Sequence, residues 1–502
     1  MMEFITKTIY LQFIACAKNA WLQMNKPELK DMFTLSDFDR SLVAKGNLVE
    51  SWAQKLFPRG VLISEFGETA RAVTVKRLAK KEPVIFQASF TSGRFLARND
   101  VLEYDSRNDV WNLYEIKGTN TLDENENSPD HIEDVAFQVA VLEDNGLKLG
   151  KIYIIHLNKE YVREDDISVD ELFIKEDVSR EVRERLEATR MKMGSAAKIL
   201  WEKDEKAVAC LCLYSARSNH CSTFSYSHPE IPEYSVHDLS RIGASKSKLT
   251  ELVDAKIYEL GEIPDSFKLT AVQRNQVFVH KTQKPLIDSS AIGKEIGSLS
   301  YPLYFLDYET YPSAIPLFKG FRPYQQVPFQ FSLHVLKDPQ AEPEHFEYLH
   351  AENTDPSEKI IANLKKYIGP RGHVIVWNKR FEKGINAQLA ERHPEAASFL
   401  NDLNERIYDL MEIFQKQLYV HPGFRGRVSI KKVLPVLVPS LSYQDLEIKE
   451  GGAAMEAWYD MVFGDKTKIE KQAIARDLSR YCGLDTYAMY LIWRELAKLA
   501  AY

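Results

Sequence analysis

The sequence lacks the features of a secreted, membrane-bound or disulfide-stabilised protein. Five cysteines in 502 residues are too few for a disulfide framework and fit a reducing compartment. No apolar run approaches the length of a membrane span, and the opening MMEFITKTIY has no signal-peptide pattern. We therefore expect a cytoplasmic protein without a membrane partner.

A strong net charge of either sign is also absent. The net charge of −7 at pH 7 gives no general attraction for nucleic acid, yet acids gathered around metal ions can coexist with local basic grooves. Apolar residues make up 45% of the chain and charged residues 27%, as in globular proteins. The length exceeds that of one ordinary core, so we expect more than one domain.

The chain contains two stretches in which strand and helix patterns alternate. Residues 1–225 carry strand segments such as PVIFQASF and VWNLYEIKG and the helix HIEDVAFQVAVLEDNG. Residues 296–502 begin with the strand YPLYFLDYE and end with the helix ARDLSRYCGLDTYAMYLIWRELAKLA. The predicted fold class is α/β, with domains at 1–225 and 296–502, each a mixed sheet with helices, and a mainly helical connector at 226–295.

Two carboxylates stand at the end of the strand YPLYFLDYE. Asp307 and Glu309 are separated by Tyr308, and alternate residues of a strand share a face. Like charges side by side resist burial unless a cation lies between them. Carboxylate oxygens suit Mg²⁺ or Mn²⁺. The pattern therefore favours a metal site, and a polar strand end facing solvent is the alternative.

Further polar residues follow later in the same domain. Glu382 comes just after the strand HVIVW, and Tyr481 and Asp485 share one face of the last helix. This order resembles the RNase H-like exonucleases of the DEDDy type, which implies a 3′–5′ exonuclease site with two metal ions. The matching residues are Asp307, Glu309, Glu382 and Asp485 as metal ligands, with Asp307 also catalytic, and Tyr481 as the residue that orients the attacking water.

One position departs from that family pattern. The superfamily has Asp after Asn-x-x-Phe, whereas here the run is Asn378-Lys-Arg-Phe-Glu382. Glutamate carries the same charge on a longer stem, so it can still bind a metal ion. Asp409, in RIYDLMEIF, is a rival or auxiliary acid.

The first domain has its own set of charged residues. Asp100 lies in the strand ARNDVLEYD, and Glu115 and Lys117 share a face of the strand LYEIKG. Acids for an ion and a lysine beside them are what metal-assisted hydrolysis needs; a solvated strand face is the alternative. The arrangement resembles the RecB-like branch of the PD-(D/E)XK nucleases. The resemblance implies that Asp100 and Glu115 bind one or two ions and that Glu115, Lys117 and Gln138 are catalytic. Glu50 is either a further acid or a surface helix residue.

Nearly the whole chain resembles a bacterial family in which a RecB-like region precedes an RNase H-like exonuclease domain. The segments YPLYFLDYETYPSAIPLFKGFRPYQQVPFQFSLHV and DLSRYCGLDTYAM carry this resemblance. It implies nuclease chemistry in both domains and leaves the pathway open between DNA repair and defence against foreign DNA.

Four cysteines are distributed as one early and three late residues. They are Cys16, Cys210, Cys212 and Cys221. Some RecB-like nucleases hold a 4Fe–4S iron–sulfur cluster with such a set, although the Cys-x-Cys spacing here is tighter than usual. Buried free thiols are the alternative. Cys482 is expected to be packed in the last helix.

We therefore expect a metal-dependent nuclease that binds nucleic acid, with DNA favoured and single strands or 3′ ends as substrates. RNA is the alternative substrate. A nucleic-acid-binding scaffold with an inactive nuclease site is a second hypothesis. A glycoside hydrolase is a third hypothesis, but such enzymes place their two carboxylates across a sugar cleft, whereas Asp307 and Glu309 are adjacent on one strand face.

Overall fold

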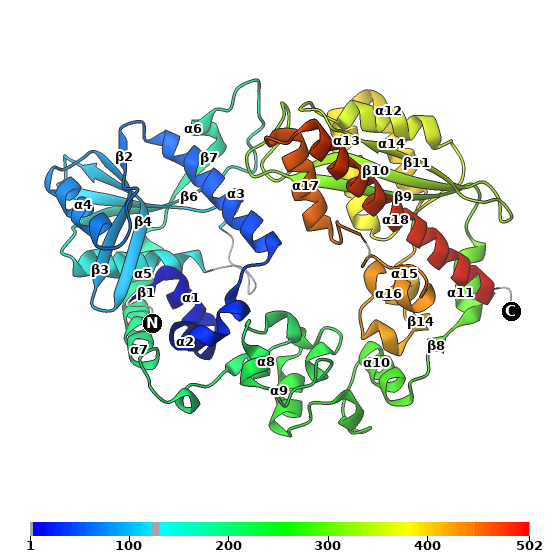
Figure 1. The fold of residues 1–502 in the computed structure, drawn as a ribbon, viewed down its shortest axis with the longest axis horizontal. Coiled ribbons are helices and arrows are strands. Elements are labelled where there is room, and N and C mark those ends of the chain that lie inside the picture. Colours follow the sequence, from blue (N-terminus) through cyan, green and yellow to red (C-terminus); the bar gives the residue numbers. More distant parts are fainter. Residues whose placement is uncertain (1–3, 123–129, 445, 501–502) are drawn as a thin grey trace. The chain divides into compact units, whose positions relative to one another are not determined.

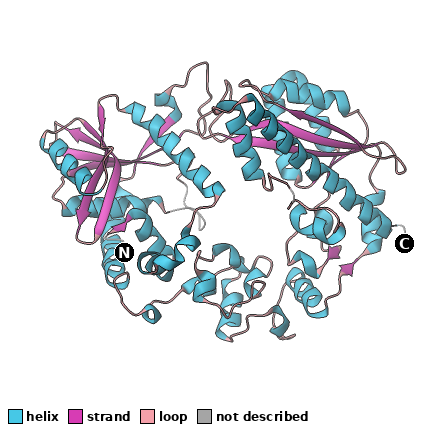
Figure 2. Ribbon diagram, in the orientation of Figure 1, coloured by secondary structure: helices cyan, strands magenta, loops and turns pink. Residues whose placement is uncertain are grey.

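The computed structural model describes residues 4–122, 130–444 and 446–500 of the chain. The protein is a mixed α/β protein that divides into two compact units (Figures 1 and 2). The first unit contains residues 1–230 and 314–324, and the second contains residues 231–313 and 325–502. The predicted α/β class is confirmed.

The segment expected to be a separate connector belongs mostly to the second unit. The division falls at residue 230, close to the expected boundary at 225. Residues 231–295 then pack with the second unit, since the short strand β8 (Leu286–Ile287) pairs with β14 (Tyr419–Val420). The helix α10 (Ala271–Thr282) also contacts β14. These contacts make the segment part of a domain.

The first unit is built on a seven-stranded mixed sheet with the order β2-β3-β4-β5-β6-β7, in which β1 pairs with β4. Its strands are β1 (Ile5–Thr6), β2 (Gly60–Leu62), β3 (Val84–Ser92), β4 (Phe95–Asp105), β5 (Val110–Ile116), β6 (Leu149–Leu157) and β7 (Phe173–Asp177). The run β3–β4–β5 is antiparallel, whereas β5 and β6 are parallel. A parallel pair needs a crossover, and α5 (His131–Asp144) provides it.

The main core of the first unit lies between this sheet and its helices. The helices are α1 (Lys7–Ala15), α2 (Ala17–Asn25), α3 (Asp37–Ala53), α4 (Gly67–Ala79), α5, α6 (Val169–Leu172), α7 (Ser179–Ile199) and α8 (Phe224–Ser227). Every residue of α5 from Glu133 to Leu142 is buried. A helix buried on all sides normally lacks charge, so the acids in its first turn call for partners.

The patterns of the sequence predict one helix over TKTIYLQFIACAKNAWLQM and one long charged helix over residues 176–206, and the structure differs at both. The opening stretch TKTIYLQFIACAKNAWLQM forms two helices, because Cys16 between them has an extended backbone (φ −158°, ψ 105°). The long helix expected at 176–206 begins only at Ser179, since Phe173–Asp177 forms the strand β7 beside β6. The second difference arises from the pairing of β7 with β6, which local periodicity does not report.

The second unit is built on a five-stranded sheet with the order β11-β10-β9-β12-β13. These strands are β9 (Leu303–Pro312), β10 (Gln326–Leu336), β11 (Glu344–Leu349), β12 (His373–Val376) and β13 (Ile407–Asp409). The pairs β9–β10 and β10–β11 are antiparallel, and β9–β12 and β12–β13 are parallel. The helices of this unit are α9 (Lys246–Asp254), α10, α11 (Ser289–Gly297), α12 (Ser357–Tyr367), α13 (Lys379–Arg392), α14 (Ala397–Glu405), α15 (Glu412–Gln415), α16 (Ile430–Leu437), α17 (Gly451–Phe463) and α18 (Lys468–Ala500).

The two faces of β9 meet different helices. Tyr304, Leu306 and Tyr308 belong to a core cluster with apolar residues of α12, α13 and α14. Phe305, on the opposite face, packs against the rings of Tyr490 and Trp493 of α18, which crosses this sheet in Figure 1. Strand alternation therefore turns Asp307 and Glu309 toward α18.

No helix in the described part of the chain combines the length and the apolar composition needed to cross a membrane.

Candidate functional site

The predicted acids of the second unit converge between β9 and α18. Single ligand atoms of Asp307, Glu309 and Cys482 lie within 4.8 Å of one another. The side chains of Glu309 and Asp485 are buried, with 7% and 8% exposure. At this separation the carboxylates of Asp307 and Glu309 repel one another unless a proton or a cation compensates them. The site is therefore suited to a divalent cation.

The pKa values of these acids show the same repulsion. Burial, and then the charges of Asp485 and Glu309, raise the pKa of Asp307 well above its usual value. Burial and the charge of Asp485 likewise raise the pKa of Glu309. Burial raises the pKa of Asp485 to about 6, although its hydrogen bonds with Tyr443 and Tyr481 oppose that rise. A bound cation would favour the ionised forms.

Two acids compete for the third ligand position. Glu382, in the first turn of α13, is 3% exposed, and its Oε2 has no hydrogen-bond partner among the described residues. Both carboxylate oxygens of Asp409, by contrast, accept backbone N–H groups, from Lys379 and Met411 at 3.0 Å each. Burial raises the pKa of Glu382 to about 8, and the charge of Glu382 in turn raises the pKa of Asp307. These contacts favour Glu382 as the ligand.

Two polar residues of this site were not predicted from the sequence. Gln330 on β10 stands opposite Glu309 in the register, is fully buried, and neither polar atom of its amide has a hydrogen-bond partner in the described chain. Tyr443 donates a hydrogen bond of 2.5 Å to Oδ1 of Asp485. Their positions follow from strand pairing and from a loop, so spacing along the sequence gave no signal for either.

Polar contacts fix α18 beside the acids. The hydroxyl of Thr486, next to Asp485, lies 2.7 Å from Ser332 Oγ and 2.8 Å from His334 Nδ1. Both partners lie on β10. Thr486 is fully buried, so these bonds hold one turn of α18 in register with the sheet and set the position of Asp485.

In the first unit, Glu115 is the centre of the predicted group. Its side chain is 1% exposed. Oε1 accepts hydrogen bonds from Lys117 at 2.8 Å and from Lys7 at 2.6 Å, and Oε2 accepts one of 2.7 Å from Gln138. Burial alone would raise the pKa of Glu115, but the charges of Lys117 and Lys7 outweigh it and lower that pKa.

Asp100 lies beside this group and connects it with Glu50. Oδ2 of Asp100 accepts the backbone N–H of Ile116 at 2.8 Å. The amide nitrogen of Gln87 donates to Asp100 at 3.2 Å and to Glu50 at 2.5 Å. Burial and the charge of Glu115 raise the pKa of Asp100. The structure thus places Glu50 within the site and not on a remote surface.

The first unit adds two charged residues that were not predicted. Asp134, on the turn of α5 before Gln138, accepts a hydrogen bond of 3.0 Å from that glutamine and forms an ion pair with Lys117. Lys7 lies 3.6 Å from Asp134 in addition to its contact with Glu115. The spacing of Asp134 and Gln138 at i and i+4 was a usable signal. Lys7 comes from the start of the chain and carried none.

The four cysteines outside the second unit form one cluster. The sulfur atoms of Cys16, Cys210, Cys212 and Cys221 all lie within 4.8 Å of one another. Cys210 Sγ is 3.7 Å from the sulfurs of both Cys16 and Cys221. Zn–S bonds of about 2.3 Å in a tetrahedron separate the sulfurs by about 3.8 Å. A cubane binds each thiolate to a different iron and needs a wider spacing. The thiols as placed fit one tetrahedral ion.

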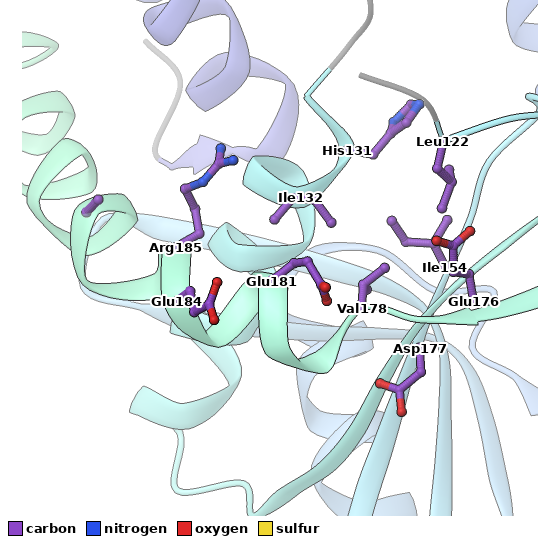
Figure 3. A pocket seen from close by; sticks show the side chains of 11 residues that line it. Leu122, His131, Ile132, Ile154, Glu176, Asp177, Val178, Glu181, Glu184 and Arg185 are labelled. Atoms are coloured by element: carbon purple, nitrogen blue, oxygen red, sulfur yellow. The ribbon is translucent and has the colours of Figure 1, made fainter. Parts of the chain in front are cut away.

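A separate cavity of about 440 Å³ opens between α5, β7 and α7 (Figure 3). It is lined by residues that include His131, Glu176, Glu181 and Arg185. The labelled carboxylates come from β7 and α7 and point in different directions in Figure 3. Burial and the charge of Lys117 lower the pKa of His131, which favours its neutral form. Among the described residues, the acids that line the cavity do not converge on one point.

Comparisons with known proteins match parts of the chain. Residues 304–429 match a domain of unknown function, DUF2779. The uncharacterized protein MG366 of Mycoplasma genitalium is 28% identical over 214 residues, which cover 38% of this chain and 31% of that protein. The uncharacterized protein UU173 of Ureaplasma parvum is 28% identical over 256 residues, which cover 45% of this chain and 36% of that protein. The matches thus span about a third of each of these relatives. No solved structure matches the chain.

Proposed function

We propose that the protein is a metal-dependent nuclease whose second unit removes nucleotides from 3′ ends. The observation that carries the proposal is that Asp307 and Glu309 have ligand atoms within 4.8 Å of each other, and that the charges of Asp485 and Glu382 raise the pKa of Asp307. Glu382 is buried, and its Oε2 has no hydrogen-bond partner among the described residues. A structural polar cluster would pair its acids with donors. Acids that raise one another's pKa are instead suited to ligating Mg²⁺ or Mn²⁺.

In this proposal bound metal ions would supply a polarised water and stabilisation of negative charge. Asp307 and Glu309, fixed on a strand, and Asp485, fixed on α18, would hold the ions. The Tyr481 hydroxyl orients the attacking water. The oxygen of that water forms the new bond to phosphorus, and the bond from phosphorus to the preceding 3′ oxygen breaks. A proton from water reaches that 3′ oxygen, so the products are a nucleoside 5′-monophosphate and a shortened strand.

The first unit is proposed to hold a second nuclease site. Asp100 and Glu115 would bind one or two ions, with Glu50 connected to them through Gln87. Lys117 would stabilise charge on the phosphate, and Gln138 fixes the carboxylate of Glu115. This assignment rests on the contacts within the unit and on the resemblance to RecB-like nucleases.

The cysteine cluster is proposed to be a structural metal centre. Cys16 lies between α1 and α2, whereas the other three cysteines follow α7, so a bound ion would connect the start of the unit with its end. Lys7, which contacts Glu115, lies on α1. Metal binding would thus stabilise α1, the helix that contributes Lys7 to the first site.

DNA is the substrate that we favour, and RNA and a non-catalytic scaffold are the alternatives. The test is incubation of the full chain with labelled single- and double-stranded DNA and RNA in Mg²⁺, Mn²⁺ or EDTA. We expect shortening of DNA that depends on the metal ion. Binding without cleavage in any metal ion would support a scaffold, and cleavage of RNA alone would reassign the substrate.

A further inference from the structure

Lys431 on α16 is a cation beside the acids of the second unit. Its Nζ lies 5.5 Å from the ring centre of Tyr481 and 5.6 Å from that of Tyr443. Tyr443 in turn bonds Asp485 at 2.5 Å. The ammonium group is therefore placed on the tyrosine side of the carboxylate cluster.

The charge of Lys431 acts on this cluster. Burial raises the pKa values of Glu309 and Asp485, and the charge of Lys431 opposes both rises. Among the described residues Lys431 forms no ion pair, and its Nζ donates one hydrogen bond, of 2.6 Å, to the backbone carbonyl of Lys449. An ammonium group has three donors, and the described residues accept one of them.

The position of this lysine is fixed from both ends. Its backbone lies in the first turn of α16, and its Nζ is held by the carbonyl of Lys449, just before α17. The side chain is half-buried. Such a lysine has lost much of its rotamer freedom before any ligand arrives, which lowers the entropy cost of binding.

A cation beside metal ligands has two opposite effects on metal binding: it keeps the acids ionised, and it repels the incoming ions. Its place there has a physical reason if an anion also enters the site. The anion that a 3′–5′ exonuclease binds is the last phosphodiester group before the free 3′ end of the strand.

We propose that Lys431 is a catalytic residue that binds a non-bridging oxygen of the scissile phosphate in the second unit. This inference rests on the proposed exonuclease function. Lys431 would donate to the phosphate from the side of Tyr443 and Tyr481, and the acids would hold the metal ions. The ammonium group would stabilise the charge that grows on the phosphate oxygens during hydrolysis.

The test compares cation binding with anion binding on the full chain. Mn²⁺ binding is measured by paramagnetic resonance, and binding of deoxyadenosine 5′-monophosphate is measured by calorimetry in saturating Mn²⁺. The Asp307→Asn chain identifies the signal of the second unit. Lys431→Met keeps the apolar stem and removes the charge. Lys432→Met is the matched control, because Lys432 is the exposed neighbour on the same helix.

We expect Lys431→Met to weaken nucleotide binding by about tenfold or more, as for loss of a charge-assisted hydrogen bond. Above the pH at which Mn²⁺ binding to the wild type levels off, its Mn²⁺ affinity should stay the same or increase, because the ammonium group repels the ions. Lys431→Arg should recover part of the nucleotide affinity, and Lys432→Met should resemble the wild type.

Unchanged nucleotide affinity in Lys431→Met would overturn the inference and leave the exonuclease proposal intact. A parallel loss of Mn²⁺ binding would also overturn it, because it would mean that the lysine only supports the fold of the site. A wild-type chain without Mn²⁺ binding that depends on Asp307 would overturn the proposed function itself.

Discussion

The hydroxyl of Tyr443 donates a hydrogen bond of 2.5 Å to Oδ1 of Asp485, a residue 42 positions later in the chain. The bond connects the loop after α16 with the helix that carries two residues of the proposed exonuclease site. Burial raises the pKa of Asp485 to about 6, and this bond is the largest effect that opposes the rise. Tyr443 therefore helps to keep Asp485 ionised, which is the form that binds a metal ion.

Tyr443→Phe should move the pH dependence of Mn²⁺ binding upward. The lost bond raises the pKa of Asp485 further, so the variant should bind Mn²⁺ poorly near pH 6.5 and recover at higher pH. A hydrogen bond to a charged group contributes about 1.5–3 kcal/mol, and about 1.4 kcal/mol corresponds to one pH unit, so the midpoint should rise by about one to two units. Mn²⁺ titrations across pH measure it. Tyr487→Phe, a change at an exposed residue of α18, is the control, and an unmoved midpoint would refute this role.

Glu382→Gln should reduce 3′ trimming far more than Asp409→Asn does. Loss of a metal ligand should lower the rate on the order of a hundredfold, whereas Asp409 is already occupied by two backbone N–H groups. Rates on a 5′-labelled single strand in Mn²⁺ measure the difference. The reverse order of the two variants would assign the ligand to Asp409.

The rate of trimming should also depend on pH. Because burial raises the pKa of Glu382 to about 8, trimming limited by metal binding should become faster as the pH rises toward that value.

Lys117→Met should abolish cleavage by the first unit while 3′ trimming continues. Lys117 contacts both Glu115 and Asp134 in that site, and loss of its charge should slow the reaction on the order of a hundredfold or more. A circular single strand has no end, so its cleavage reports internal cutting alone. Lys159→Met, an exposed position in the turn after β6, is the control. Loss of both activities in a folded Lys117→Met chain would mean that the two sites are coupled.

The cysteine cluster should bring metal into the purified protein. The sulfur spacing fits one tetrahedral ion, so anaerobic preparations should contain about one zinc per chain without acid-labile sulfide. Cys210→Ser should remove the metal and lower the melting temperature. Iron with sulfide would show that the thiols separate around a 4Fe–4S cluster, as the resemblance to RecB-like nucleases implies. A protein free of both metals would leave the cysteines as packed thiols.

Several strands and helices of both units were predictable because their patterns are local. The strand YPLYFLDYE and the helix HIEDVAFQVAVLEDNG appear as β9 and α5, and strand alternation correctly turned Asp307 and Glu309 to one face. The predicted acids needed only their own strand or helix to be recognised. What periodicity could not report was pairing between distant segments, such as the pairing of β7 with β6.

The residues that were not predicted from the sequence are those that lie far in the sequence from the site residues that they contact. Lys7 reaches Glu115 across 108 positions. Tyr443 and Lys431 come from a loop and a short helix with no motif of their own, and Gln330 is defined by its register with Glu309. Cys482 was expected only to be packed, yet its sulfur lies 3.8 Å from Oδ2 of Asp307. Only the fold brings such side chains to the site.

The most direct test of the central claim follows a 5′-labelled single DNA strand incubated with the full chain in Mn²⁺. Strands with a free 3′ hydroxyl are compared with strands whose 3′ end is blocked, and the wild type with Asp307→Asn. We predict stepwise shortening from the 3′ end by the wild type, protection of the blocked strand, and on the order of a hundredfold loss in Asp307→Asn, with EDTA stopping the reaction. Equal shortening by a folded Asp307→Asn chain, or no shortening by the wild type in any divalent cation, would contradict the claim.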